Sequence, residues 1–296
     1  MRPSRCTFGL RPDGVTTSLQ RQYCETPFCT AKSWAELGAA VSEVLHERLE
    51  GGILLLRINR PEAKNALNQE VRRLLAEQCS AAATDDGVKA IVLTGNAEAF
   101  AAGADIKAMA EATPIELMLR RNHEQWQAIA RCPKPIVAAV NGYALGGGCE
   151  LAMHADIIVA GETATFGQPE VRVGIMPGAG GTQRLARAVG KFKAMLICLT
   201  GQTFSGREAF DMGLASKVVP DAEVLDAALE IARTIAKMPP LAIRQIKEVM
   251  LAGADAPLET GLMLERKAFQ MLFDSADQKE GMRAFLEKRK PSYKGA

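Results

Sequence analysis

The sequence has few of the residues that metal sites and disulfide frameworks require. Its 296 residues include only three histidines and no HExxH motif, and its seven cysteines form no CxxC pair. Histidines and paired cysteines are the usual protein ligands of zinc. We therefore expect no metal site, and we expect the cysteines to be free thiols in a reducing compartment.

Long apolar runs and an excess of basic charge are also missing. No run approaches the ~18–20 apolar residues needed to cross a bilayer, so we expect no membrane insertion. The chain carries 36 Lys and Arg against 34 Asp and Glu, and residues 41–296 hold 31 of each sign. Because a nucleic-acid-binding protein usually shows a basic excess, we expect no nucleic-acid partner.

Residues 1–42 differ from the rest of the chain. They are rich in Ser, Thr, Cys, Gly and Pro, contain several arginines, and lack a steady apolar period. We interpret them as an N-terminal extension that is disordered or not native to the mature protein, which favours a cytoplasmic location. The alternative is a transit peptide, which would place the protein in mitochondria.

From residue 43 onward, short apolar strands alternate with helices, which predicts an α/β layered fold. Strands are predicted at 52–61, 89–96, 135–145 and 155–167, and helices at 68–86 and 114–132. After about residue 185 the pattern is mostly helical, with one late strand at 214–220. We predict a core with the active site over 43–200 and a helical region over 201–296.

Three segments contain more glycine than a simple turn requires: residues 99–109, 143–153 and 166–185. They match neither the dinucleotide fingerprint nor a P-loop. Two of them follow an apolar strand and enter a helix, where backbone N–H groups are unpaired and the helix dipole adds partial positive charge. One N–H from each turn, at Ala104 and Gly147, could together form an oxyanion hole.

Two carboxylates accompany these turns. Glu150 lies in the first turn of the helix that begins near Gly147, and Glu170 follows the turn at 167–169 in an apolar setting. Taken singly, each could be an ordinary acid at a helix start. Two carboxylates in a semi-apolar site repel each other, so one keeps its proton, which gives one base and one acid.

These segments resemble the crotonase (enoyl-CoA hydratase/isomerase) superfamily, and the match covers roughly residues 48–296. Within it, the pattern is similar to bacterial enoyl-CoA hydratases, especially those acting on 2,3-dehydroadipyl-CoA in phenylacetate breakdown. Six motifs occur in family order: NRPEAKNALN, AFAAGADI, NGYALGGGCELA, FGQPE, PGAGGTQRL and FLEKRKPSYKG.

The resemblance implies a crotonase (ClpP-like) spiral of β-β-α units with a C-terminal helical trimerisation region, assembling as a homotrimer or homohexamer. It implies a hydro-lyase that adds water to a trans-2-enoyl-CoA, with CoA as part of the substrate and no separate cofactor. Glu150 and Glu170 would be catalytic, and Ala104 and Gly147 would form the oxyanion hole. Substrate or CoA contacts are expected from four further residues: Asp105, Ile106, Lys107 and Gly178.

Two other functions remain open from the sequence. One is a Δ3-Δ2 enoyl-CoA isomerase, and the other is a non-catalytic, RNA-binding member of the superfamily. The acyl chain is also open. Arg120, Arg121 and Arg172 could pair with a distal carboxylate, although a solvated surface is the favoured interpretation for all three.

Overall fold

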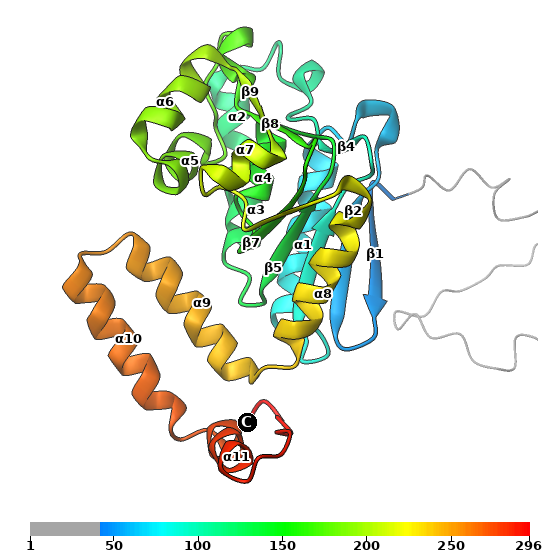
Figure 1. Cartoon of the computed structure of the whole chain (residues 1–296). Helices are drawn as coiled ribbons and strands as arrows, with labels where there is room; N and C mark the ends of the chain where they lie inside the picture. The colour runs from blue at the N-terminus through cyan, green and yellow to red at the C-terminus, as the bar shows by residue number, and fades with distance from the viewer. Residues whose placement is uncertain (1–41) are drawn as a thin grey trace, which may run out of the picture. The chain divides into compact units, whose positions relative to one another are not determined.

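The computed structural model describes residues 42–296 (Figure 1). The predicted extension at 1–42, apart from Ser42, therefore lies outside the described residues. Two sheets are present. The larger has the order β1 (Val44–Leu49), β2 (Ile53–Ile58), β3 (Ala90–Thr94), β5 (Ile136–Val140), β7 (Ile157–Gly161) and β10 (Lys217–Val219). The smaller has the order β4 (Ala99–Ala101), β6 (Tyr143–Leu145), β8 (Thr165–Gly167) and β9 (Thr203–Ser205).

The chain passes repeatedly from the larger sheet to the smaller one. β3, β5 and β7 are neighbouring parallel strands of the larger sheet, and the strand that follows each of them (β4, β6 and β8) belongs to the smaller sheet. The strands of the smaller sheet are parallel in the same order, apart from β9, which pairs antiparallel with β8. This repetition is the predicted spiral of β-β-α units.

The predicted strands at 135–145 and 155–167 are each two strands in different sheets, and β1, β4 and β9 were not predicted. A glycine explains the first division. Gly142, between β5 and β6, has a φ of +59°, and a Cβ added there would lie 1.9 Å from the carbonyl oxygen of Glu98. Only glycine allows the chain to turn at this point against the neighbouring segment.

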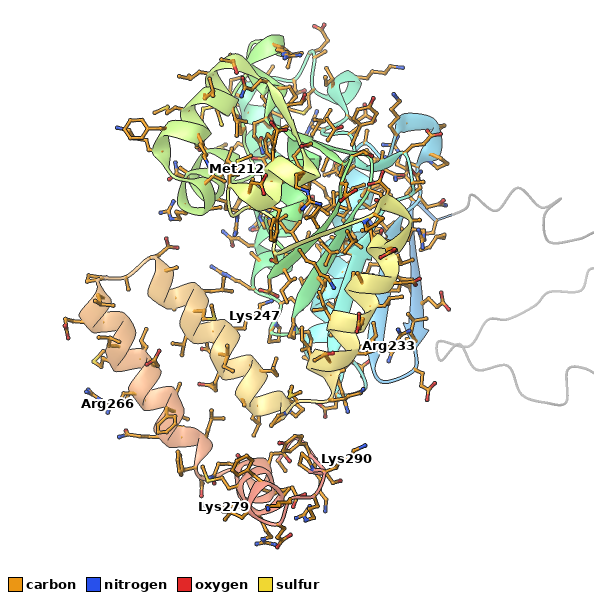
Figure 2. All side chains as sticks on the ribbon, viewed as in Figure 1. Met212, Arg233, Lys247, Arg266, Lys279 and Lys290 are labelled. Carbon is orange, nitrogen blue, oxygen red and sulfur yellow. The ribbon has the colours of Figure 1, made fainter. Side chains whose placement is uncertain are left out.

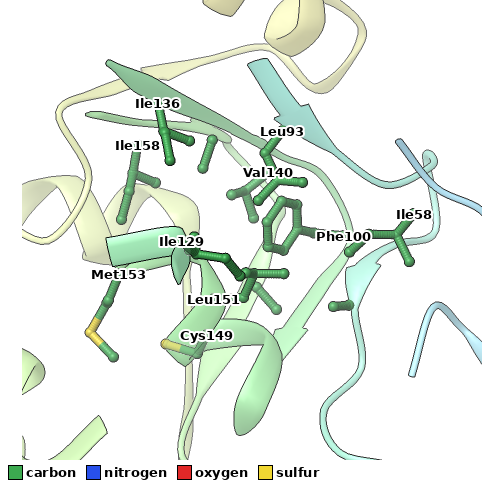
Figure 3. Close-up of a cluster of buried hydrophobic side chains, with 14 of the residues drawn as sticks. Ile58, Leu93, Phe100, Ile129, Ile136, Val140, Cys149, Leu151, Met153 and Ile158 are labelled. Atoms are coloured by element: carbon green, nitrogen blue, oxygen red, sulfur yellow. The ribbon is translucent and has the colours of Figure 1, made fainter. Parts of the chain in front are cut away.

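Helices cover both faces of the larger sheet. Helix α8 (Val224–Ala236) packs on one face, against inward side chains that include Ile53, Val92 and Val137. Helices α1 (Gln69–Ala83) and α3 (Asn122–Ala130) lie on the other face, with α4 (Gly147–Ala152) between the two sheets. Figure 3 shows part of this second core, where Cys149 and Leu151 from α4 lie near Phe100 and Val140.

The predicted helix at 114–132 is broken in two. Helix α2 (Pro114–Leu119) ends at Arg120, and α3 begins at Asn122. Arg121 between them has a φ of +49°, in the left-handed region that an arginine rarely adopts. The residues on either side of the break, Arg120 and Asn122, line a cavity described below.

The remaining helices lie in the C-terminal half of the chain. The chain ends in a helical region, as predicted. The chain carries, in order, α5 (Gly181–Val189), α6 (Lys191–Thr200), α7 (Gly206–Asp211), α9 (Pro240–Ala254), α10 (Leu258–Leu272) and α11 (Ala276–Leu286). Short 3-10 helices are η3 (Pro61–Ala63), η4 (Ile106–Ala108), η5 (Pro169–Val173) and η6 (Asp221–Glu223). No helix within 42–296 has the length and apolar character needed to span a membrane.

Lys247 joins helix α9 to the segments that precede β5 and β7. Lys247, labelled in Figure 2, places its Nζ 2.7 Å from Asp156 Oδ2 and 3.0 Å from the Lys134 carbonyl oxygen. Helices α9 and α10 pack against each other. No residue of α9 is buried, and large apolar side chains are exposed along α9, α10 and α11, among them Ile246, Met250, Leu258, Phe269 and Phe285.

Candidate active site

Each glycine of the Gly146–Gly148 run lies where the backbone closely approaches a different neighbouring group. Gly146 has a φ of +50°, and a Cβ there would lie 2.8 Å from Glu170 Oε1. A Cβ on Gly148 would lie 1.9 Å from the Ala101 carbonyl oxygen, so α4 and β4 approach as closely as two backbones can. Gly147 is the first residue of α4, and its Cα faces Ala104. The run therefore brings α4 against both neighbouring segments.

The two predicted oxyanion donors lie side by side. A Cβ added to Gly147 would be 3.5 Å from the backbone nitrogen of Ala104 and 3.7 Å from Leu67 Cδ1. Gly147 begins a helix, so its N–H has no partner within the helix. Within residues 42–296 the N–H of Ala104 makes no hydrogen bond either. Two unpaired N–H groups thus share one small space.

Glu150 is held rigidly. Its side chain is buried, and its Oε1 accepts hydrogen bonds of 2.7 Å from the backbone N–H groups of Ala179 and Gly181. The neighbouring side chains of Cys149 and Leu151 are fixed in the core (Figure 3). Burial raises the pKa of Glu150, and the two N–H donors oppose that effect by favouring the ionised form.

Glu170 is the less buried of the two acids and has the higher tendency to keep a proton. It lies in η5, directly after Gln168 and Pro169. Burial, assisted by the negative charge of Glu150, raises the pKa of Glu170 to about 7. When the side-chain amide of Gln168 is turned so that its nitrogen faces Glu170, that nitrogen lies 3.2 Å from both carboxylate oxygens and can donate to them.

The four residues named from the sequence as catalytic or oxyanion groups are thus neighbours. Glu170 lies against Gly146, Gly147 lies against Ala104, and a Cβ on Gly181 would meet Glu150 Oε1 at 2.9 Å. The arrangement offers two N–H donors for a developing oxyanion and two acids of different proton affinity beside them. Such a site can transfer protons to and from carbon next to a carbonyl group.

The other expected contact residues are more peripheral. Asp105 follows Ala104 and pairs with Arg60 at 3.4 Å. Ile106 and Lys107 are exposed in η4. Gly178 is exposed with open space around it, and Ala179 and Gly181 of the same turn hold Glu150. The sequence did not predict that the N–H groups of Ala179 and Gly181 donate to Glu150, because every residue except proline has a backbone N–H. The PGAGG motif was the only indication that this turn lies at the site.

Other polar groups near the site are buried without access to a ligand. Burial raises the pKa of the Cys149 thiol to about 12 and lowers the pKa of His154 to about 4, so both are neutral. His154 packs against Trp126, with ring centroids 5.0 Å apart.

The described cysteines, Cys79, Cys132, Cys149 and Cys198, are free thiols. No trio of His, Cys, Asp or Glu within 42–296 is arranged to hold a metal ion.

Comparison with known proteins gives a consistent result. The profile of the family described as enoyl-CoA hydratase/isomerase matches residues 48–296. The chain is 44% identical over 255 residues to the 2,3-dehydroadipyl-CoA hydratase of Escherichia coli K12, covering 86% of this chain and all of that protein. It is 45% identical over 240 residues to the mitochondrial enoyl-CoA hydratase of Pongo abelii, covering 81% of this chain and 83% of that one.

Solved structures show the same fold. The enoyl-CoA hydratase of Bacillus anthracis superimposes with a TM-score of 0.82 at 34% identity, covering 86% of this chain and 100% of that one. A protein from Mycobacterium tuberculosis H37Rv with the same description superimposes with a TM-score of 0.79 at 37% identity, covering 86% of this chain and all of that one. The spiral and the helical end therefore have close structural counterparts.

Proposed function

The chain belongs to the enoyl-CoA hydratase/isomerase family, and on this premise we propose that it adds water reversibly to trans-2-enoyl-CoA thioesters, giving 3-hydroxyacyl-CoA. One observation carries the proposal. The carboxylates of Glu150, which is buried, and Glu170, which is half-buried, lie beside two unpaired N–H groups, those of Ala104 and Gly147.

The proposed mechanism uses these four groups. The N–H groups of Ala104 and Gly147 donate to the thioester oxygen, which stabilises the enolate-like charge that develops there. Glu150 takes a proton from water as the water oxygen bonds to C3. Glu170 gives its proton to C2. Glu150 then holds one proton and Glu170 none, and exchange with solvent restores the starting state.

The environments of the two acids support this division of roles. Burial raises the pKa of both acids. At Glu150 the two N–H donors oppose this effect and favour the ionised form, which suits a base, whereas at Glu170 the nearby Glu150 charge adds to it and favours the protonated form, which suits an acid. CoA arrives as part of the substrate, and the mechanism assigns no step to a metal or redox cofactor.

The substrate is proposed at a finer level from the relatives. The Escherichia coli relative is described as a 2,3-dehydroadipyl-CoA hydratase. We therefore include 2,3-dehydroadipyl-CoA among the substrates, with a role in phenylacetate or fatty-acid breakdown. We also propose a homotrimer or a hexamer of two trimers. Contacts between subunits would bury the apolar side chains that are exposed on α9, α10 and α11 of the single chain. Light scattering would give the number of chains.

A cytoplasmic location is proposed, with a mitochondrial one if residues 1–42 act as a transit peptide. The mitochondrial hydratases of Dictyostelium discoideum and Pongo abelii are among the relatives. Fractionation of its own cells would decide the location, and the intact mass of the purified protein would show whether residues 1–42 are retained.

Turnover of crotonyl-CoA tests the proposed function. A hydratase removes the ultraviolet absorbance of the conjugated thioester and yields 3-hydroxybutyryl-CoA. A 3-enoyl-CoA that gives a conjugated product without an alcohol would instead identify an isomerase. No reaction with either substrate, together with RNA binding, would point to the non-catalytic alternative.

The raised pKa of Glu170 predicts the pH dependence of hydration. The active pair carries one proton, with Glu150 ionised and Glu170 protonated. As pH rises through about 7, Glu170 loses its proton and kcat/KM falls. At low pH, kcat/KM also falls because Glu150 takes up a proton. A profile with crotonyl-CoA checks this, and a kcat/KM that is constant or rising from pH 6.5 to 8.5 would contradict it.

A methyl group at Gly181 is expected to displace the base. A Cβ there would lie 2.9 Å from Glu150 Oε1 and 2.7 Å from Pro177 Cβ. We expect Gly181→Ala to lower kcat by about 10²-fold or more, the lower part of the range for general base catalysis. Gly253→Ala in α9, where the added methyl meets Gly261 at an ordinary 3.7 Å, is the matched control. Equal kcat values for the two variants would exclude this positioning role.

A further inference from the structure

A cavity of about 160 Å³ adjoins the oxyanion pair and has arginines in its wall. The wall includes Leu67, whose backbone pairs with Ala104 in an isolated bridge, and Asp105, the residue after Ala104. One water molecule takes up ~30 Å³ in the liquid, so the cavity has room for about five waters. That is enough for a carboxylate with the methylene groups that carry it.

Arg72 is a half-buried cation that lacks a full set of acceptors. Its Nη1 donates to the Leu67 carbonyl oxygen at 2.8 Å. Its Nε is buried and, within the described part of the chain, has no hydrogen-bond partner. Burial, followed by the positive charge of Arg120, lowers the pKa of Arg72. An anion in the cavity would offset the like charges of Arg72 and Arg120.

The charges of the wall add up to an anion-binding site. Asp105 is the acid in the wall, and its Oδ2 lies 3.4 Å from Nη2 of Arg60, a guanidinium that also lies 3.2 Å from Glu43 Oε1. With Arg72 and Arg120 against this one acid, the cavity wall has a formal excess of one positive charge. Arg120 reaches the wall because the chain breaks after it, with Arg121 in the left-handed region.

We infer that this cavity binds the terminal carboxylate of a dicarboxylic enoyl-CoA, with Arg72 and Arg120 as the groups that pair with it. The inference rests on the proposed hydratase function, because it places the thioester carbonyl at Ala104 and Gly147. Arginine is suited to the task, because its planar fork binds a carboxylate through two parallel hydrogen bonds.

An anionic oxygen group on an acyl-CoA has two sources, the far end of the acyl chain and the phosphates of CoA. The carboxylate is the better match for two reasons. The cavity wall contains Leu67, the bridge partner of Ala104, and Asp105, the next residue in the chain, so the cavity lies beside the proposed position of the thioester carbonyl. Its volume of about 160 Å³ is also below the ~300 Å³ of the smallest usual ligand pockets, so it suits the end of an acyl chain better than the whole nucleotide part of CoA.

The test compares three substrates: crotonyl-CoA, trans-2-hexenoyl-CoA and 2,3-dehydroadipyl-CoA. The last two have six-carbon chains and differ in the terminal carboxylate. The protein is expected to prefer dehydroadipyl-CoA over hexenoyl-CoA in kcat/KM. Arg72→Met is expected to lower that preference about 10- to 100-fold, the range for a hydrogen bond to a charged group, and Arg72→Lys to restore part of it. Arg120→Met is expected to act in the same direction.

Arg73→Met is the matched control. Arg73 lies next to Arg72 on α1, but it is exposed and pairs with Glu70 and Glu77 at the surface. Its loss should leave the preference unchanged. A loss in Arg72→Met that is equal for all three substrates would assign the arginine to CoA phosphate and overturn the inference. So would a protein that turns over crotonyl-CoA without preferring dehydroadipyl-CoA.

A second measurement needs no variant. Adipyl-CoA and hexanoyl-CoA lack the double bond, so they act as inhibitors of crotonyl-CoA hydration. Adipyl-CoA is expected to have the lower inhibition constant, by about 10-fold or more. Equal constants would overturn the inference while leaving the hydratase function intact, whereas failure to hydrate crotonyl-CoA would remove the proposed function itself.

Discussion

Glu150→Gln and Glu170→Gln are each expected to lower kcat for hydration by about 10²- to 10⁴-fold, the contribution of one positioned acid or base. Glutamine has the shape of glutamate, so its oxygen can still accept from Ala179 and Gly181 in place of Glu150 Oε1. It cannot take up or release a proton under these conditions. Stopped-flow or steady-state assays with crotonyl-CoA measure the loss.

The same two variants should still bind acyl-CoA. The dissociation constant of butyryl-CoA, which has no double bond to hydrate, is expected to change little, because the oxyanion donors are backbone groups. Glu162→Gln is the control, since Glu162 is an exposed acid that pairs with Arg207. Turnover near that of the unaltered protein in either catalytic variant would refute the assignment of two carboxylates.

The acids act on one water and one alkene, so their losses should not add. Once one proton transfer is blocked, the other acid has no step to assist, and the double variant is expected to be little worse than either single variant. Losses that add fully in free energy would mean that the two acids act in independent steps.

Gly147→Pro is the second change with a large expected effect. Proline removes the N–H that Gly147 offers to the thioester oxygen, and it is well tolerated at the first position of a helix, which Gly147 occupies in α4. Loss of one oxyanion donor costs about 10²- to 10³-fold in kcat. Gly147→Ala keeps the N–H and adds a methyl at ordinary contact distance from Ala104 and Leu67.

The comparison of these two variants tests whether the Gly147 nitrogen must be a free donor. Both place a Cβ in the same position, but proline also replaces the hydrogen on the nitrogen by its Cδ, so it removes the donor and fills the space in front of the nitrogen. We expect the proline variant to be slower than the alanine variant by about 10²-fold. Equal rates, with both proteins folded by circular dichroism, would show that the Gly147 N–H is not an oxyanion donor.

Much of the site could be predicted because its signals are local. A glycine run at the start of a helix, followed at once by a carboxylate, already indicates close backbone approach, and the structure places Gly146 against the second carboxylate, Glu170. The roles of Glu150 and Glu170 remain predictions until they are tested by substitution. Their proximity, twenty residues apart in the chain, follows from the parallel neighbours β6 and β8, which precede them.

Features that depend on the backbone of another segment could not be predicted. The donors to Glu150 are N–H groups of Ala179 and Gly181, whose side chains carry no sign of that role. The division of residues 135–145 between two sheets depends on the approach of Glu98 to Gly142. The break at Arg121 occurs at a residue with no preference for a left-handed conformation, so the sequence predicted one helix there.

The break also explains why the arginine cavity was missed. In an unbroken helix, Arg120 would belong to a solvated face, which was the favoured interpretation of Arg120, Arg121 and Arg172. The structure agrees with that interpretation for Arg121, which pairs with Glu124 at the surface, and for Arg172, which is exposed. Arg72 gave no sign of its position, because the other charged residues of the cavity wall, Asp105 and Arg120, lie at the start of η4 and at the end of α2.

The most direct test of the central claim is a crystal structure of the protein with bound butyryl-CoA. We expect the thioester oxygen within hydrogen-bond distance of the nitrogens of Ala104 and Gly147, and a water molecule between the carboxylates of Glu150 and Glu170 near C3. A thioester oxygen bound elsewhere, or either carboxylate turned away from C2 and C3, would contradict the account.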